Sequence, residues 1–171
     1  MESIVHSISG LPPFNSSLET GIRALVVLEA FYPRRCDLLE MTWLDHLVVH
    51  TGDLEGQDVP VSLHPDLPNR AGELLVRRQL IERSLRLMQQ VHLVEVFETE
   101  AGIEFCASEG APSYLDLLQA PYSIALKQRA KWMADRFAGM ETNQMRALID
   151  SRIGRWTAEF GTDEAPKGIL G

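Results

Sequence analysis

Two histidines, His46 and His50, lie four residues apart, a spacing that places both on one face of a helix and can hold a metal ion. Asp45 and Asp53 are close to them in the chain. No glutamate follows His46 to act as a general base, and the next histidine, His64, falls in a predicted loop. We therefore expect hydrogen-bonded histidines at a helix end, with the helix dipole favouring protonated His50, and we expect neither a metal nor a cofactor.

Cys36 is the residue closest in character to a nucleophile. Arg34 and Arg35 precede it and a predicted helix begins just after it, and both features would lower the pKa of its thiol. The other cysteine, Cys106, is distant in sequence, so both are expected to be buried free thiols in a reducing cytoplasm. The chain has neither a glycine-rich phosphate loop nor a nucleophile-elbow motif. We predict that it is not an enzyme.

Five arginines lie in one predicted helix, residues 70–90, and are the strongest candidates for binding a partner or a DNA backbone: Arg70, Arg77, Arg78, Arg83 and Arg86. Arginine suits both phosphate and guanine, and in a winged helix this helix would enter the major groove. Three features favour protein docking over sequence-specific DNA reading. The helix is apolar on two faces, residues 51–68 are longer than a helix-turn-helix turn, and the following hairpin is acidic.

Two helices are predicted before that one. Ser16 and the glutamate three residues later form a capping box, and apolar residues then recur at helical spacing until Pro33 ends the helix. A second capping box, Asp37 and Glu40, opens a helix that ends at about His50. A long loop then leads to the arginine-bearing helix.

The helix of residues 70–90 has two apolar faces. Leu74, Ile81, Leu85 and Met88 form one, and Val76, Leu80 and Leu87 form the other. Such a helix is packed on both sides and should be central, with its arginines reaching outward between the faces. Residues 91–98 and 103–107 then alternate or run apolar around a short turn, which predicts a β-hairpin. Three helices followed by a hairpin is the order of a winged helix-turn-helix.

The remainder is predicted to be helical, with a short helix at about 113–119 and longer helices from Pro121 to Gly139 and over 142–160. Trp156 on the last helix is expected to pack in the core, with a partner contact as the alternative. The fold class is mainly α: a winged helix-turn-helix-like domain with a β-hairpin wing and additional C-terminal helices. The predicted parts are an N-terminal extension (1–12), a winged-helix-like domain (13–109), a C-terminal helical extension (110–160) and a flexible tail (161–171).

The 171 residues carry 16 lysines and arginines against 24 aspartates and glutamates, a net charge of −8 that repels nucleic acid and anionic membranes. The charges alternate in blocks, acidic over 37–66 and 95–116 and basic over 70–86 and 127–136. Such blocks indicate either a surface that meets another protein or pairing within the fold. The N-terminal segment lacks the character of a secretory signal, so we expect a cytoplasmic protein.

Four stretches of the sequence resemble the middle component of bacterial ABC-three-component systems, which are Lamassu-like anti-phage and anti-plasmid defence operons. These stretches are PFNSSLETGIRAL (13–25), CDLLEMTWLDHLVVHTGD (36–53), SLHPDLPNRAGELLVRRQLIERSLRLM (62–88) and RIGRW (152–156). The likeness covers about residues 13–160 and includes no catalytic signature.

The resemblance implies a small winged-helix-like protein that accompanies an SMC/Rad50-like ABC ATPase and an effector subunit, often a nuclease. On this interpretation the chain is a non-catalytic accessory subunit that bridges the ATPase and the effector, and DNA is contacted through the complex. No catalytic residue can be carried over, because none is established for the family. The alternative is a dimeric winged-helix transcription regulator that binds DNA directly.

Overall fold

The computed structural model describes residues 16–65 and 70–161, and of residues 70, 71, 75 and 153–161 it describes the backbone. The predicted N-terminal extension, and the predicted tail beyond Gly161, lie outside the described residues. In chain order the elements are α1 (Ser17–Phe31), β1 (Cys36–Asp37), α2 (Leu38–Val49), η1 (Thr51–Asp53), α3 (Arg70–Gln90), β2 (Val94–Thr99), β3 (Gly102–Ala107), α4 (Ala111–Asp116), α5 (Pro121–Phe137) and α6 (Thr142–Gly161).

Both predicted helix starts are capped by the predicted residue. The Ser16 hydroxyl accepts a hydrogen bond from the Glu19 backbone N–H at 3.1 Å, and the Asp37 carboxylate accepts one from the Glu40 N–H at 2.9 Å. Each bond satisfies an N–H group that has no partner within its own helix. The local sequence therefore sets where α1 and α2 begin.

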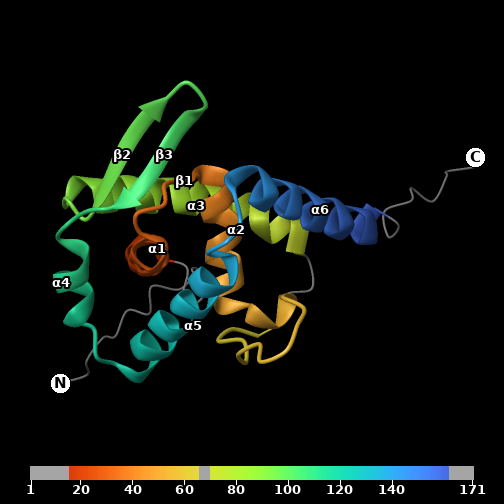
Figure 1. Cartoon of the computed structure of the whole chain (residues 1–171), viewed down its shortest axis with the longest axis horizontal. Helices are drawn as coiled ribbons and strands as arrows, with labels where there is room; N and C mark the ends of the chain where they lie inside the picture. The colour runs from red at the N-terminus through yellow and green to blue at the C-terminus, as the bar shows by residue number, and fades with distance from the viewer. Residues whose placement is uncertain (1–15, 66–69, 162–171) are drawn as a thin grey trace, which may run out of the picture.

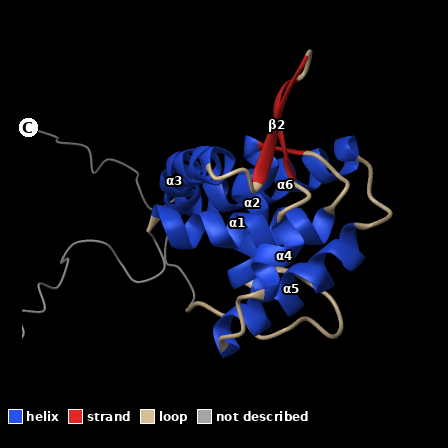
Figure 2. Ribbon diagram, turned by 90° about the vertical axis from the view of Figure 1, so that its left-hand side faces the viewer, coloured by secondary structure: helices blue, strands red, loops and turns tan. Residues whose placement is uncertain are grey.

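The first half of the chain follows the order α1–β1–α2–α3–β2–β3, and its three strands pair antiparallel in the order β1-β3-β2. The predicted hairpin is confirmed, with Val94 opposite Ala107 and Thr99 opposite Gly102. The two-residue strand β1 is too short to be read from the sequence and pairs Cys36 with Phe105. The fold is thus mainly α and winged-helix-like, as predicted. We call the β2–β3 hairpin the wing; it stands out from the helical body (Figures 1 and 2).

One hydrophobic core joins the winged-helix part to the C-terminal helices. Leu25 of α1, Trp43 of α2, Met133 of α5 and Ile149 of α6 are all fully or almost fully buried in it. Helix α1 lies between α3 on one side and α5 on the other (Figure 1). Burying one large apolar side chain contributes roughly 1.5–3 kcal/mol, so this shared core holds the outer helices firmly against α1.

The two predicted apolar faces of α3 are packed unequally. Ile81 and Leu85 are fully buried, whereas Val76 is 66% exposed and Leu80 and Leu87 are half-buried. The prediction that α3 is covered on both sides is therefore wrong, because α1, α2 and α6 pack on one side and leave a broad strip open. No helix in the described part of the chain is long and apolar enough to cross a membrane.

Candidate interaction surfaces

The open strip of α3 carries three of the predicted arginines. Its exposed residues, which we call the α3 outer face, are Val76, Arg78, Gln79, Glu82, Arg83, Arg86, Gln89 and Gln90. Arg86 forms an ion pair with Glu82 at 3.2 Å, and both side chains are largely exposed, so the pair contributes little stability. Three arginines against one glutamate make this face basic on an otherwise acidic protein.

Arg77 does not belong to this face. It is 6% exposed, and its Nη1 donates to the Asp45 carboxylate at 2.5 Å. The expectation that it reaches outward fails, because its position on α3 faces α2 and a fully buried carboxylate there requires a cation. The side chain of Arg70 and that of Trp156 lie outside the described residues.

Asp45 is the centre of a buried ion cluster that ties three helices together. Arg23 of α1 donates to it from Nε at 2.6 Å and from Nη2 at 3.1 Å, and Arg77 of α3 donates from the other side. Burial alone would raise the pKa of Asp45, but the two guanidinium groups outweigh burial and lower it. Burial alone would lower the pKa of Arg23, but the attraction of the Asp45 carboxylate outweighs burial. The pKa of Arg23 is therefore raised.

Three histidine rings continue this cluster toward α5. The ring of His46 stacks on that of His50 at 4.6 Å, and His64 lies edge-on to His50 at 5.9 Å. His46 Nε2 is 2.8 Å from an Asp53 carboxylate oxygen, and His64 Nε2 is 2.8 Å from the Tyr122 hydroxyl. The histidines thus serve as hydrogen-bonded links between α2, the following loop and α5.

The predicted protonation of His50 is wrong. Burial, followed by the nearby His46 and Arg77, lowers the pKa of His50 to about 3. Desolvation, together with the buried Arg77 guanidinium, outweighs the helix dipole, which acts mainly on exposed ends. Within residues 16–65 and 70–161, no group of three or more histidine, cysteine, aspartate or glutamate side chains is placed to hold a metal.

The Cys36 thiol is also unlike the nucleophile that its neighbours suggested. Burial, with the Glu40 carboxylate as the next contribution, raises the pKa of Cys36 to about 12. Its fully buried position outweighs the attraction of the Arg34 guanidinium, which acts in the opposite direction. Cys36 is therefore a protonated core residue at neutral pH. Cys106, the other cysteine, is likewise buried and free.

The two acidic blocks of the sequence have different fates. In the first block, Asp37 binds Arg146, Asp45 binds the two buried arginines and Glu55 binds Arg152. The second block, residues 95–116, contributes to no ion pair found among the described residues. Pairing within the fold thus involves several acids of the first block and leaves the second at the surface, mostly on the wing.

The basic block of α5 is also used within the chain. Arg129 donates to the Val61 carbonyl from Nε at 2.9 Å and from Nη2 at 2.7 Å. Arg136 donates to the Glu55 carbonyl. These two arginines hold the loop of residues 54–65 against α5, which explains how a connection much longer than a helix-turn-helix turn is kept in place.

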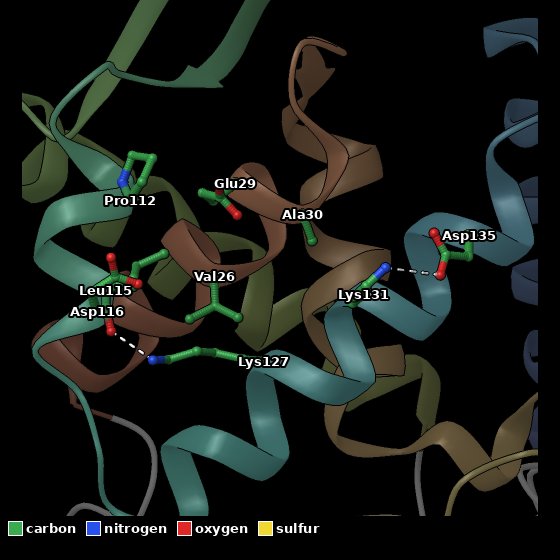
Figure 3. Close-up of a pocket in the computed structure, with 9 residues that line it drawn as sticks. All are labelled: Val26, Glu29, Ala30, Pro112, Leu115, Asp116, Lys127, Lys131 and Asp135. Atoms are coloured by element: carbon green, nitrogen blue, oxygen red, sulfur yellow. Dashed lines mark hydrogen bonds and ion pairs between the residues drawn. The ribbon is translucent and has the colours of Figure 1, made fainter.

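A groove lies between α1, α4 and α5, on the side of α1 that faces away from α3 (Figure 3). Its cavity of about 380 Å³ has Val26, Ala30 and Leu115 among its lining residues, and it adjoins a second hollow of about 460 Å³. Lys127 donates to the carbonyls of Leu115 and Leu118, and Lys131 pairs with Asp135. Both lysines are therefore engaged within the chain, and the groove is an apolar hollow with a charged rim.

The sequence reasoning missed the buried ion pair of Arg23 and Asp45, whose exposed fractions are 2% and 0%. A signal was present, because each lies within a run of apolar residues on its helix. A charge on an apolar face predicts a buried partner of the opposite sign. Spacing along the chain could not identify that partner, because the two residues are 22 positions apart.

The chain was compared with known protein families, curated proteins and solved structures. Residues 13–159 match the family model of the ABC-three component (ABC-3C) system Middle Component 2. No curated protein and no solved structure matches the chain. The matched region spans nearly all of the described fold, including the α3 outer face, the wing, the buried ion cluster and the groove. The chain therefore belongs to the Middle Component 2 family and is a component of an ABC-three-component defence system.

Proposed function

We propose that the chain is a non-catalytic accessory subunit that binds an SMC/Rad50-like ABC ATPase and an effector subunit at the same time. The family match carries this proposal, since a middle component of a multi-subunit system has partner subunits. The burial of the residues whose side chains could act as a nucleophile or base also supports the proposal. Cys36 is a buried thiol, and His46 and His50 are buried in the helical core.

Two separate and differently charged surfaces support a bridging role. The α3 outer face is basic, and the groove between α1, α4 and α5 is lined by apolar residues and by charged residues of both signs. These surfaces lie on opposite sides of α1, so one subunit can occupy each without competing for space (Figure 1). We assign the α3 outer face, through Arg78, Arg83 and Arg86, to an acidic partner surface or to the DNA backbone within the complex.

The alternative function, a dimeric DNA-binding regulator, has one observation in its favour. In winged-helix DNA-binding proteins the third helix enters the major groove, and Arg78 and Arg83 are exposed on α3. Two observations weigh against it. Arg77 is withdrawn into the core, and the wing beside α3 is acidic and would repel phosphate.

The test is reconstitution of the purified chain with the ABC ATPase and effector subunits encoded beside it. We expect a ternary complex, and we expect Arg78→Glu combined with Arg83→Glu to lose one partner while keeping the other. Glu141→Lys, an exposed charge reversal that lies in neither surface, is the control and should bind both. Tight, steeply salt-dependent binding of duplex DNA at ~150 mM salt by the isolated chain would favour the regulator instead. Substrate turnover by the isolated chain would refute a non-catalytic role.

A further inference from the structure

Strand β2 is an open edge of the sheet. In the order β1-β3-β2, its Val94–Thr99 backbone pairs with β3 on one side, and no other strand of the described chain pairs with it on the other. Alternate N–H and C=O groups of β2 therefore point away from β3, which is the arrangement that allows another strand to be added. The wing projects from the helices, so this edge can be reached from outside (Figure 2).

The charged residues of the hairpin itself are all negative. The hairpin from Val94 to Ala107 carries four glutamates and no lysine or arginine: Glu95, Glu98, Glu100 and Glu104. The first three are exposed, and none of the four forms an ion pair with another described residue. Arg35 lies over the ring of Phe97 at 3.6 Å and bonds to none of these carboxylates.

A second copy of this chain is disfavoured in the register that pairs the whole of β2 with itself. In the fully overlapping antiparallel pairing of β2 with a second β2, Glu95 of each copy would lie directly opposite Glu98 of the other. Like charges directly opposite each other destabilise a strand pair. Nucleic acid is repelled by the same carboxylates. The occupant must therefore be a protein segment with the opposite charge.

We propose that the β2 edge binds an extended, basic segment of a partner protein, which adds to the sheet as a fourth strand. The spacing of the glutamates specifies its sequence pattern. Residues opposite Glu95 and Glu98 are three positions apart on the added strand, and the two residues between them lie opposite Val96 and Phe97, which are half-buried. The expected segment is thus basic–apolar–apolar–basic. The assignment goes beyond the proposed function and stands whether or not the chain bridges two subunits.

The test uses the full chain, labelled with ¹⁵N, and two synthetic probes, acetyl-Thr-Lys-Val-Val-Lys-Thr-amide and its counterpart with glutamate in place of both lysines. Strand addition places main-chain hydrogen bonds on the edge, so the amide signals of Val94–Thr99 should shift on titration with the lysine peptide. The glutamate peptide should leave them unchanged. Glu95→Lys combined with Glu98→Lys should weaken binding of the lysine peptide about tenfold or more.

Charge-swapped and matched variants show whether the charge of β2 itself determines which peptide binds. The Glu95→Lys, Glu98→Lys chain should instead bind the glutamate peptide, which shows that the variant is folded and that the edge itself is intact. Glu109→Lys combined with Glu141→Lys changes the net charge equally at exposed sites outside β2 and should bind the lysine peptide as the original chain does. The proposal is overturned if the lysine peptide shifts no β2 amide, if both peptides act equally, or if the two double variants weaken binding alike.

Discussion

Replacing Asp45 with asparagine tests whether the buried ion cluster holds α1, α2 and α3 together. The side chain of Asp45 is fully buried, and those of Arg23 and Arg77 are 3% and 5% exposed. Asparagine has nearly the same shape, so the substitution leaves no cavity. It removes the negative charge that lies between two buried guanidinium groups, and Arg77 keeps only its longer pair with Glu73, at 3.7 Å.

The expected loss of stability is large. Removing one partner from a buried ion pair costs about 3–5 kcal/mol, because the remaining charge stays out of water without compensation. In a chain of this size each kcal/mol lowers the unfolding midpoint by roughly 2–4 °C, so we expect a decrease of roughly 6–20 °C. Asp135→Asn is the matched control. It breaks an exposed pair with Lys131, in which both side chains are more than 70% exposed, and should cost at most about 0.5 kcal/mol.

Thermal and urea unfolding followed by circular dichroism measure both variants. A third variant separates a missing charge from a missing contact: Arg23→Met, Asp45→Leu and Arg77→Met together replace the whole cluster with apolar groups. Such replacements are often neutral or stabilising, so this variant should be more stable than Asp45→Asn alone. If Asp45→Asn unfolds at the same temperature as Asp135→Asn, the cluster does not hold the helices and the reasoning is refuted.

Three further predictions concern buried or clamped groups. The pKa of His50 in the folded chain is about 3, below its usual 6.5, so the stability that neutral His50 supports is complete above pH 6.5 and falls as the pH drops toward 3. His50→Gln should therefore reduce the slope of the unfolding free energy against pH by about 1.4 kcal/mol per pH unit near pH 5. An unchanged slope would contradict this. Cys36 should resist iodoacetamide at pH 8 in the folded chain and react only on unfolding, and rapid alkylation in native conditions would show that its pKa is not raised to about 12. Arg129→Ala should speed proteolysis within residues 54–65, with Lys131→Ala as an unaffected control, and equal digestion would show that the arginine does not hold this loop.

Local features explain why the secondary structure could be predicted from the sequence. Ser16 and Asp37 each satisfy an N–H group three residues away, so the information that starts α1 and α2 lies within one helical turn. The hairpin is also set by residues that are close in the chain, because Thr99 and Gly102 pair across a two-residue turn. Periodicity and capping act over the same short range, which is why the order of the α-helices and the hairpin and the winged-helix-like class were predicted correctly.

Long-range pairing explains what could not be predicted. Arg77 and Arg78 are adjacent on one helix and were given the same role, yet one is buried and the other exposed. Their fates differ because Asp45, 32 residues before Arg77, occupies the space beneath α3. The predicted directions of the pKa shifts of Cys36 and His50 were wrong for the same reason, since burial by distant elements outweighs the charges and dipoles of sequence neighbours.

The distribution of charge separates this winged helix from one built to read DNA. A DNA-reading wing and its third helix must both favour phosphate, and here they have opposite signs: α3 exposes arginines and the wing exposes glutamates. A single polyanion can approach one of these surfaces only against the repulsion of the other. Two protein surfaces, one acidic and one basic, would each be attracted to its own element. On the functions proposed above, the helix and hairpin that a DNA reader would turn toward one nucleic acid would instead be two neighbouring docking surfaces of opposite charge, and the groove of α1, α4 and α5 would be a third.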